Sequence, residues 1–211
     1  MQMIKIQIPD RAESAKAMIE MSRRGRIDCY ADDVYMVPET YEAGAVRLYR
    51  ATRFPEDWTL DSTLVSGKPF VDSSLVRYRD RWWMFTSTPE NDDLLLYSAA
   101  VLRGPWTPHP SNPIVRGNKR ISRPGGRVLT MNDHVLRFAQ DDETSYGRQV
   151  FAFEVRRLDE TGFDEAPAGD GPVVGPSGSG WNRDRMHTVD AHAVAPDRWI
   201  ASVDGKGPVP R

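Results

Sequence analysis

Three short segments of the chain carry polar residues that could act together on a ligand. Asp72 precedes two serines, Arg123 and Arg127 flank a Gly-Gly pair, and His187 stands shortly before Asp190. Two guanidiniums near one another suit a carboxylate, a phosphate or sugar hydroxyls, and glycine lets the backbone approach a ligand closely. An imidazole adds proton transfer or metal binding. These residue types indicate recognition of a polar ligand.

Each of these residues also has a purely structural interpretation. Asp72 could cap a turn through its own backbone. The two arginines could belong to a salt-bridged loop, and His187 could be a hydrogen-bonded histidine of the core. Because the segments lie far apart in the sequence, a joint site needs a fold that brings them to one place.

The elements that would position these residues repeat along the chain. Four segments place an Asp at a turn before a short apolar or aromatic run, namely residues 32–37, 80–85, 133–138 and 197–202. A period of roughly 50 residues built from short strands is typical of a β-propeller, whose sheets bury their faces only against neighbouring sheets. Further aromatic residues recur in order after each turn, and we expect them to pack between sheets: Tyr49, Tyr97 and Phe151, then Trp58, Trp106 and Phe163. The sequence therefore predicts a mainly β fold.

In a propeller, the innermost strand of each sheet comes just before the hairpin turn that carries the repeated Asp. Asp72, residues 122–127 and residues 185–190 each open such an innermost strand. We therefore expect these three segments to converge on one central channel from different sheets.

The repeat divides the chain into two parts. Residues 1–30 lie outside it and are expected to form a short strand, a helix within residues 11–24 and a loop. Residues 31–211 are expected to form the partial propeller, with a long surface loop in the Gly- and Pro-rich stretch 165–181.

Composition narrows the classes of partner. The chain of 211 residues has 28 Lys and Arg against 30 Asp and Glu, a net charge of −2, which gives no electrostatic reason for nucleic-acid or membrane binding. Its single cysteine excludes an internal disulfide framework, and no apolar run reaches the roughly 20 residues that span a bilayer. The first residues do not resemble a signal peptide, so we expect a cytoplasmic location.

The order of motifs from residue 31 onward resembles a known family, the N-terminal domain of the glucosamine inositolphosphorylceramide transferases and its bacterial relatives. The motifs that carry this resemblance extend over roughly residues 31–205 and are residues 35–40, 46–51, Phe54-Pro55, Trp58, Asp72, Gly104-Pro105-Trp106, His109, Asn112-Pro113, Gly126-Arg127, Gln140-Asp141, Tyr146-Gly147, His187 and Asp204-Gly205. That domain is similar to the five-bladed propellers of the family 43 glycoside hydrolases. The resemblance implies a channel that faces carbohydrate.

The resemblance also implies roles for individual residues. It makes Asp72 the acidic residue at a blade opening and adds Gln140, Asp141 and Tyr146 to Arg123, Arg127 and His187 as substrate-binding residues. It further implies a possible calcium ion in the central channel, with His187 as a ligand, although no cofactor is required. In the plant transferases, glycosyl transfer belongs to a separate C-terminal domain.

The chain departs from the family pattern in two ways that bear on function. It carries about three to four blades, so the propeller is expected to be incomplete, with open sheet edges through which a homo-oligomer could form. A canonical glycosidase needs two carboxyl groups across the scissile bond, and residues 123–127 supply no Glu to pair with Asp72. Glu39 and Asp141 could substitute, but both are expected to face away from the axis.

Three functions stay open. The preferred one is a carbohydrate-binding or accessory domain that does no chemistry. The second is a family 43-like glycosidase acting on a furanosidic or related glycan, with Asp72 as its base or orienting carboxylate. The third is a structural or protein-interaction propeller.

Overall fold

A computed structural model describes residues 6–7, 26–30, 33–131, 133–195 and 198–208. The strands in these ranges form four sheets, and none of the helices there is long and apolar enough to cross a bilayer. The strands are β1 (Ile6–Gln7), β2 (Arg26–Tyr30), β3 (Asp33–Val37), β4 (Ala45–Arg53), β5 (Asp57–Ser66), β6 (Val71–Tyr78), β7 (Arg81–Ser87), β8 (Leu94–Ala99), β9 (Thr107–Pro108), β10 (Leu129–Met131), β11 (His134–Gln140), β12 (Val150–Leu158), β13 (Phe163–Pro167), β14 (Val189–Ala195) and β15 (Arg198–Val203), with short 3-10 helices η1 (Tyr41–Ala43) and η2 (Gly180–Asn182).

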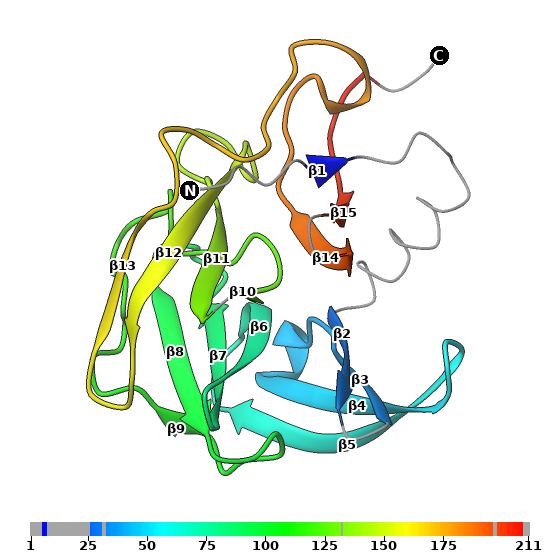
Figure 1. Cartoon of the computed structure of the whole chain (residues 1–211), viewed down its shortest axis with the longest axis vertical. Helices are drawn as coiled ribbons and strands as arrows, with labels where there is room; N and C mark the ends of the chain where they lie inside the picture. Colours follow the sequence, from blue (N-terminus) through cyan, green and yellow to red (C-terminus); the bar gives the residue numbers. More distant parts are fainter. Residues whose placement is uncertain (1–5, 8–25, 31–32, 132, 196–197, 209–211) are drawn as a thin grey trace.

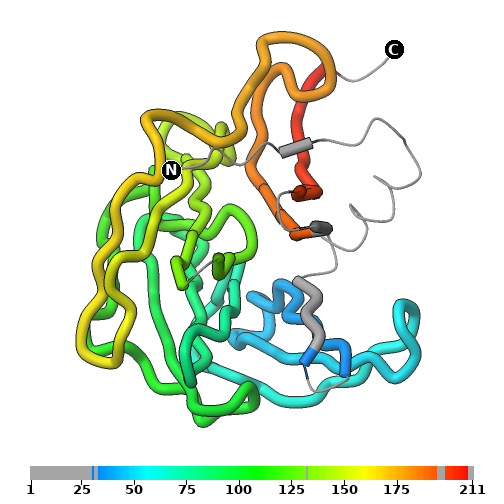
Figure 2. The backbone as a smooth tube through the Cα atoms, in the orientation of Figure 1, coloured from blue at the N-terminus to red at the C-terminus, as the bar shows by residue number. Residues whose placement is uncertain are grey.

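The sheets follow the order of the chain. Three are antiparallel and four-stranded, with strand orders β2-β3-β4-β5, β6-β7-β8-β9 and β10-β11-β12-β13. The fourth has the order β1-β15-β14. Figure 1 shows β2, β6, β10 and β14 nearest the middle of the molecule and β5, β9 and β13 at its periphery, and the tube in Figure 2 passes from each sheet to the next around this centre. The prediction of a mainly β fold is confirmed, and it consists of several antiparallel sheets.

Two of the repeated turns can be seen directly. Arg79 and Asp80 join β6 to β7, and Asp133 joins β10 to β11. Arg79 and Asp133 adopt the left-handed backbone, with φ of 55° and 63°, a region in which Asp is enriched among residues other than glycine. The corresponding residues 32 and 197 lie outside the described ranges.

The first sheet begins earlier in the sequence than predicted. β2 pairs with β3 from Arg26↔Val37 to Tyr30↔Asp33, so residues 26–30 belong to the repeat and supply its innermost strand. The prediction that residues 26–30 lie outside the repeat is therefore wrong. The helix expected within residues 11–24 lies outside the described residues.

β1 belongs to the last sheet, although it comes first in the chain. It runs parallel to β15, with Ile6 opposite Trp199 and Gln7 opposite Ile200. A strand edge exposes unpaired backbone donors and acceptors, and β1 pairs with those of β15.

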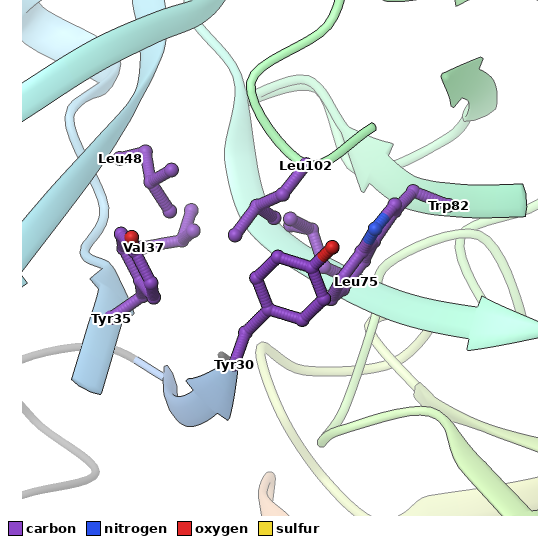
Figure 3. Close-up of a pocket in the computed structure, with 7 residues that line it drawn as sticks. All are labelled: Tyr30, Tyr35, Val37, Leu48, Leu75, Trp82 and Leu102. Atoms are coloured by element: carbon purple, nitrogen blue, oxygen red, sulfur yellow. The ribbon is translucent and has the colours of Figure 1, made fainter. Parts of the chain in front are cut away.

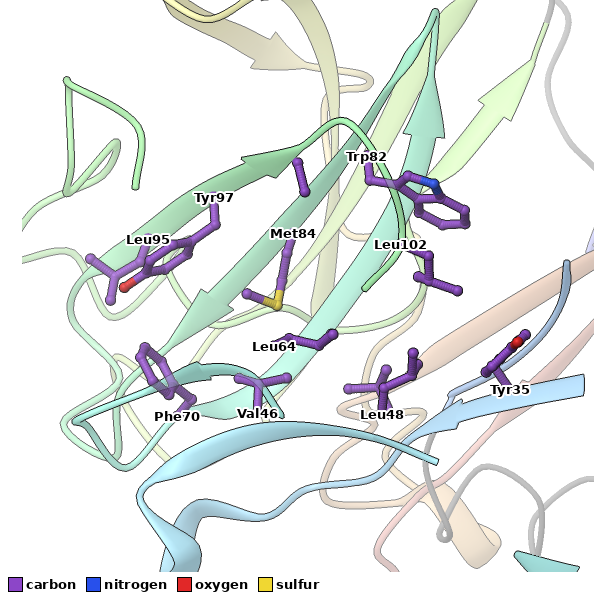
Figure 4. Packing of buried hydrophobic residues seen from close by; sticks show 12 residues of the cluster. Tyr35, Val46, Leu48, Leu64, Phe70, Trp82, Met84, Leu95, Tyr97 and Leu102 are labelled. Atoms are coloured by element: carbon purple, nitrogen blue, oxygen red, sulfur yellow. The ribbon is translucent and has the colours of Figure 1, made fainter. Parts of the chain in front are cut away.

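Apolar side chains fill the space between successive sheets. Between the first two sheets, Val46 and Leu48 of β4 face Met84 of β7 and Tyr97 of β8, in a cluster that Figure 4 shows from close by. Similar clusters join the second sheet to the third and the third to the fourth. Because each sheet is covered mainly by its neighbours, the stack is stabilised as a series of interfaces.

Half of the recurring aromatic residues lie in these interfaces, as predicted, namely Tyr97, Trp106 and Phe163, whereas Tyr49, Phe151 and Trp58 belong to none of the three clusters. Tyr97 packs edge-on against Phe70 with ring centroids 6.0 Å apart, and Phe163 contacts Phe85 in the same way at 6.0 Å. Trp58 differs, because it lies on the β4–β5 hairpin and packs against the exposed Phe54.

A small apolar gap remains between the first two sheets (Figure 3). Its volume is about 10 Å³, the space of about one water molecule. It is lined by Tyr30, Tyr35, Val37, Leu48, Leu75, Trp82 and Leu102. An apolar space of this size stays dry and holds no ligand, so polar chemistry has to be sought elsewhere.

Candidate functional site

Asp72 is aimed by an irregularity at the start of β6. The pairing of β6 with β7 shifts register between Val71 and Ser74, and Asp72 has a φ of 47°. A bulge of this kind redirects a side chain. The Asp72 Oδ2 atom accepts hydrogen bonds from Arg123 Nε at 2.5 Å and from Gln140 Nε2 at 3.0 Å. The second and third sheets therefore meet at this carboxylate.

Arg123 organises the residues around Asp72. Its side chain is 10% exposed, its Nη1 donates to Asn91 Oδ1 at 2.8 Å, and its Nη2 lies 3.9 Å from Glu39 Oε2. Burial is the largest single influence and favours the uncharged form of the guanidinium, but the charge and hydrogen bond of Asp72 together with the charges of Tyr146 and Asp142 outweigh it, and the pKa of Arg123 is raised. Arg123 is thus a charged group fixed by partners from the first and second sheets.

Glu39 belongs to this group of residues, contrary to the expectation that it faces away from the centre. It follows β3, and its pKa is raised, mainly by burial and then by the charge of Asp72, while Arg123 opposes the shift. The second strand of each sheet runs antiparallel to the first and returns to the rim where the first began. Residues after β3 and β7, such as Glu39 and Asn91, therefore reach the same rim as Asp72.

Tyr146 covers the other side of Arg123. Its ring centroid lies 5.0 Å from the Arg123 Cζ atom and 5.4 Å from the ring of His187, and the residue is 45% exposed. The close approach depends on Gly147, where a Cβ atom would lie 2.3 Å from the His187 Cβ atom. His187 in turn places Nδ1 2.7 Å from Asp204 Oδ2.

Asp142 lies beside the same residues. One of its oxygens accepts the Gly147 backbone N–H. Its pKa is raised, mainly by burial and also by the charge of Asp72, while Arg123 and His187 act in the opposite direction. We call these residues the Asp72 cluster: Glu39, Asp72, Asn91, Arg123, Gln140, Asp142, Tyr146, His187 and Asp204.

Arg127 lies in a different place from Arg123. Its Nε donates to Asp190 Oδ1 at 2.7 Å, and Asp190 Oδ2 lies 3.2 Å from His192 Nε2. Burial alone would raise the pKa of Asp190, but the bond to His192 and the charge of Arg127 hold it well below its usual range. Neighbouring Gly126 allows this contact between the third and fourth sheets, since a Cβ there would lie 1.8 Å from the Val189 oxygen.

Asp141 also has a separate role. It is 4% exposed, its Oδ2 accepts from Gln149 Nε2 at 2.8 Å, and it lies 3.9 Å from Arg120 Nε. These contacts hold the loop between β11 and β12.

The predicted residues thus fall into two groups. The fold brings together Asp72, Arg123, Gln140, Tyr146 and His187, whereas Arg127 and Asp141 contact other partners. The two arginines do not form a joint anion receptor, because each is paired with its own aspartate. Sequence reasoning missed the contributions of further residues, namely Glu39, Asn91, Asp142 and Asp204.

The residues around His187 do not suit the calcium ion that the family resemblance implies. Calcium takes six to eight oxygen ligands, and His187 contacts one carboxylate, that of Asp204. Within the described ranges, no group of three or more His, Cys, Asp or Glu is arranged to hold a metal.

The fold is shared with an exo-β-1,3-galactanase from Clostridium thermocellum. The TM-score is 0.53 at 13% sequence identity, and the match covers 66% of this chain and 33% of that chain. The class of protein is therefore defined by its fold, a mainly β fold of several antiparallel sheets whose structural neighbours are propeller glycosidases.

Sequence comparison identifies the family within that class. The chain belongs to the family described as glucosamine inositolphosphorylceramide transferase 1, N-terminal, whose model matches residues 26–206. The transferase of that name from Oryza sativa subsp. japonica is 36% identical over 184 residues, which are 83% of this chain and 25% of that protein. The Arabidopsis thaliana transferase is 30% identical over 184 residues, 83% of this chain and 24% of its own length. The resemblance read from the motifs is confirmed, and the chain spans about a quarter of the length of these relatives.

Proposed function

We propose that this domain binds carbohydrate at the Asp72 cluster and does no chemistry on it. The observation that carries the proposal is the convergence on Arg123 of a carboxylate, an amide and an exposed aromatic ring from different sheets. Hydrogen-bonding groups beside an exposed aromatic face suit a sugar, which has hydroxyls on its edge and C–H groups on its faces. The fold shared with the galactanase supports the same ligand class.

We further propose that the four sheets are blades of a propeller of the five-bladed type implied by the family resemblance. Their radial order and the position of β2, β6, β10 and β14 near the middle support this (Figure 1). The polar residues of the Asp72 cluster would then lie at one rim of the central channel. Self-association through an exposed sheet edge is a further prediction, to be tested by light scattering.

Calorimetric titration with β-1,3-galacto-oligosaccharides tests the binding function. Asp72→Asn removes the charge while keeping the shape, and we expect it to weaken binding by about tenfold. Asp170→Asn, at an exposed position in the loop after β13, is the matched control and should bind like the wild type. A wild-type protein that binds none of these sugars contradicts the proposal.

A second candidate is glycoside hydrolysis, which the pair Glu39 and Asp72 favours. Two carboxyl groups with different environments can divide acid and base roles. Asp72 accepts from a guanidinium at 2.5 Å, whereas burial raises the pKa of Glu39. Turnover of chromogenic glycosides, lost in both Asp72→Asn and Glu39→Gln, would establish this function in place of simple binding.

A further inference from the structure

Two of the recurring aromatic residues, Tyr49 of β4 and Trp58 of β5, lie outside the packing between sheets. Because side chains alternate along a strand, Tyr49 lies on the opposite face of the sheet from Leu48, which packs against the second sheet. Cross-strand pairing places Leu60 opposite Tyr49 and Trp58 opposite Ala51. We call the face formed by Tyr49, Ala51, Trp58 and Leu60 the outer hairpin face.

The outer hairpin face is apolar and accessible. Leu60 is 49% exposed, and Tyr49, Ala51 and Trp58 are partly exposed. Phe54, 47% exposed, extends the apolar surface to the tip of the hairpin, where its ring centroid lies 6.0 Å from that of Trp58. Figure 1 shows the hairpin of β4 and β5 projecting beyond the other strands of the first sheet. Contiguous exposed apolar residues on a projecting element mark an interaction surface.

The two ends of this face carry opposite charge. At one end, Arg47 pairs across the strands with Thr63, and its Nε atom has no hydrogen-bond partner within the described residues. At the other end, Arg53 lies 3.5 Å from Glu56 and 2.9 Å from Asp57, whose side chains are 62% and 56% exposed. Two carboxylates share one guanidinium there, so the tip of the hairpin has an excess of negative charge.

This arrangement is complementary to itself. Arg47 stands two residues before Tyr49, and the charged tip begins at Arg53, two residues after Ala51. The apolar row therefore lies between the cationic and the anionic end. A two-fold axis through the row lays the same patch on itself, which brings the cationic end of each copy to the anionic tip of the other. Aromatic, apolar and arginine side chains are also the types enriched where proteins meet.

We propose that the chain forms a symmetric dimer through the outer hairpin face, with a second copy of the chain covering the apolar row. This surface is distinct from the edges of the sheets and from the Asp72 cluster. A buried aromatic side chain removes about 150–250 Å² from water, and the rings here are already partly covered, so the contact amounts to about 500 Å² per copy. Stable interfaces bury about 800 Å² per partner. The dimer is therefore weak, with an expected dissociation constant of about 10–100 µM.

Sedimentation velocity of the whole chain between about 5 and 500 µM tests this proposal. We expect the sedimentation coefficient to rise with concentration towards that of a dimer. Leu60→Asp places a charge in the apolar row and should raise the dissociation constant at least about tenfold. Thr59→Asp is the matched control, because it puts the same charge on the adjacent exposed residue, whose side chain points to the opposite face.

Charge reversal tests the two-fold arrangement independently. Arg47→Glu should weaken the dimer about threefold to tenfold. Adding Glu56→Lys to this variant should recover part of the loss, since the reversed charges again face each other across the axis. Melting curves identify a variant that fails to fold, and if Leu60→Asp does, the charge-reversal variants carry the test.

A chain that stays monomeric at about 500 µM would overturn the proposal, because the expected dissociation constant lies well below that concentration. Equal weakening by Leu60→Asp and Thr59→Asp would also overturn it, because both residues lie on the edge strand β5 and the association would then run through that edge.

Discussion

Replacing Arg123 by methionine should destabilise the protein by about 2–3 kcal/mol at neutral pH. The substitution removes the bond of 2.5 Å to Asp72 and the bond of 2.8 Å to Asn91. Hydrogen bonds to charged groups contribute about 1.5–3 kcal/mol each, and breaking a buried ion pair costs about 3–5 kcal/mol. The side chains of Asp72 and Glu39 are 28% and 40% exposed, so water compensates part of this loss. The expected destabilisation is therefore about 2–3 kcal/mol and not the full sum of these contributions.

The pH dependence distinguishes this mechanism from a loss of packing. Arg123 opposes the upward shift in pKa at both Glu39 and Asp142, so its removal should raise both pKa values further. A carboxyl group whose pKa is raised by folding favours the folded state most at low pH, and this contribution is lost as the pH rises through the folded-state pKa. The difference in stability between the variant and the wild type should therefore shrink between pH 7 and about pH 4.5.

Chemical denaturation at several pH values measures both effects. Arg53→Met is the control, because Arg53 forms exposed ion pairs with Glu56 and Asp57 that contribute less than about 1 kcal/mol. A deficit for Arg123→Met that stays constant or grows as the pH falls would refute the electrostatic explanation.

Three further predictions concern other parts of the molecule. Gly126→Ala should destabilise the protein by more than about 2 kcal/mol, because the new Cβ would meet the Val189 oxygen at 1.8 Å. Gly169→Ala, where the new Cβ would lie in open space, should change the free energy of unfolding little. Equal effects of the two substitutions would contradict the close contact between Gly126 and Val189. Asp190→Asn should destabilise the protein at neutral pH, because the lowered pKa of Asp190 stabilises the folded state at pH values above the ordinary Asp pKa. This stabilisation is lost as the pH falls through the folded-state pKa, so the difference in unfolding free energy between wild type and variant, measured by urea denaturation, should shrink in acid. A difference that does not change with pH would contradict this explanation. A chelator should leave the thermal melting temperature unchanged. A calcium-dependent shift of the melting temperature would show that the protein binds the calcium ion that the family resemblance implies.

The sequence was sufficient to predict the general fold because the repeat is carried by turns and apolar runs. Asp80 and Asp133 mark turns at which a first strand reverses into a second, and Tyr97, Trp106 and Phe163, which follow them, pack between sheets. The first strand of the first sheet was missed, although Ile27 and Cys29 alternate with polar residues shortly before the turn. Alternation over so few residues is a weak signal. Residues 26–30 form a strand because they pair with β3.

The candidate site was predicted in part, for a geometric reason. Asp72 and Arg123 could be predicted because both lie where an innermost strand of a sheet begins. Glu39, Asn91 and Gln140 lie where second strands end, and antiparallel pairing returns these ends to the same rim. Of these three, Gln140 was predicted from the family resemblance, Glu39 was expected to face away from the axis, and Asn91 was not predicted. That Arg123 and Arg127 have separate partners depends on side-chain direction across Gly125 and Gly126, which spacing alone does not determine.

Chemical-shift mapping of ¹⁵N-labelled protein during titration with β-1,3-galactobiose tests carbohydrate binding at the Asp72 cluster most directly. The side-chain resonances of Arg123 Nε–H and Gln140 Nε2 report on the two donors that hold Asp72. We predict that both shift in a saturable way, together with the backbone amides around Tyr146. Saturable shifts confined to another surface, such as the hairpin that carries Phe54 and Trp58, would contradict this location of the site.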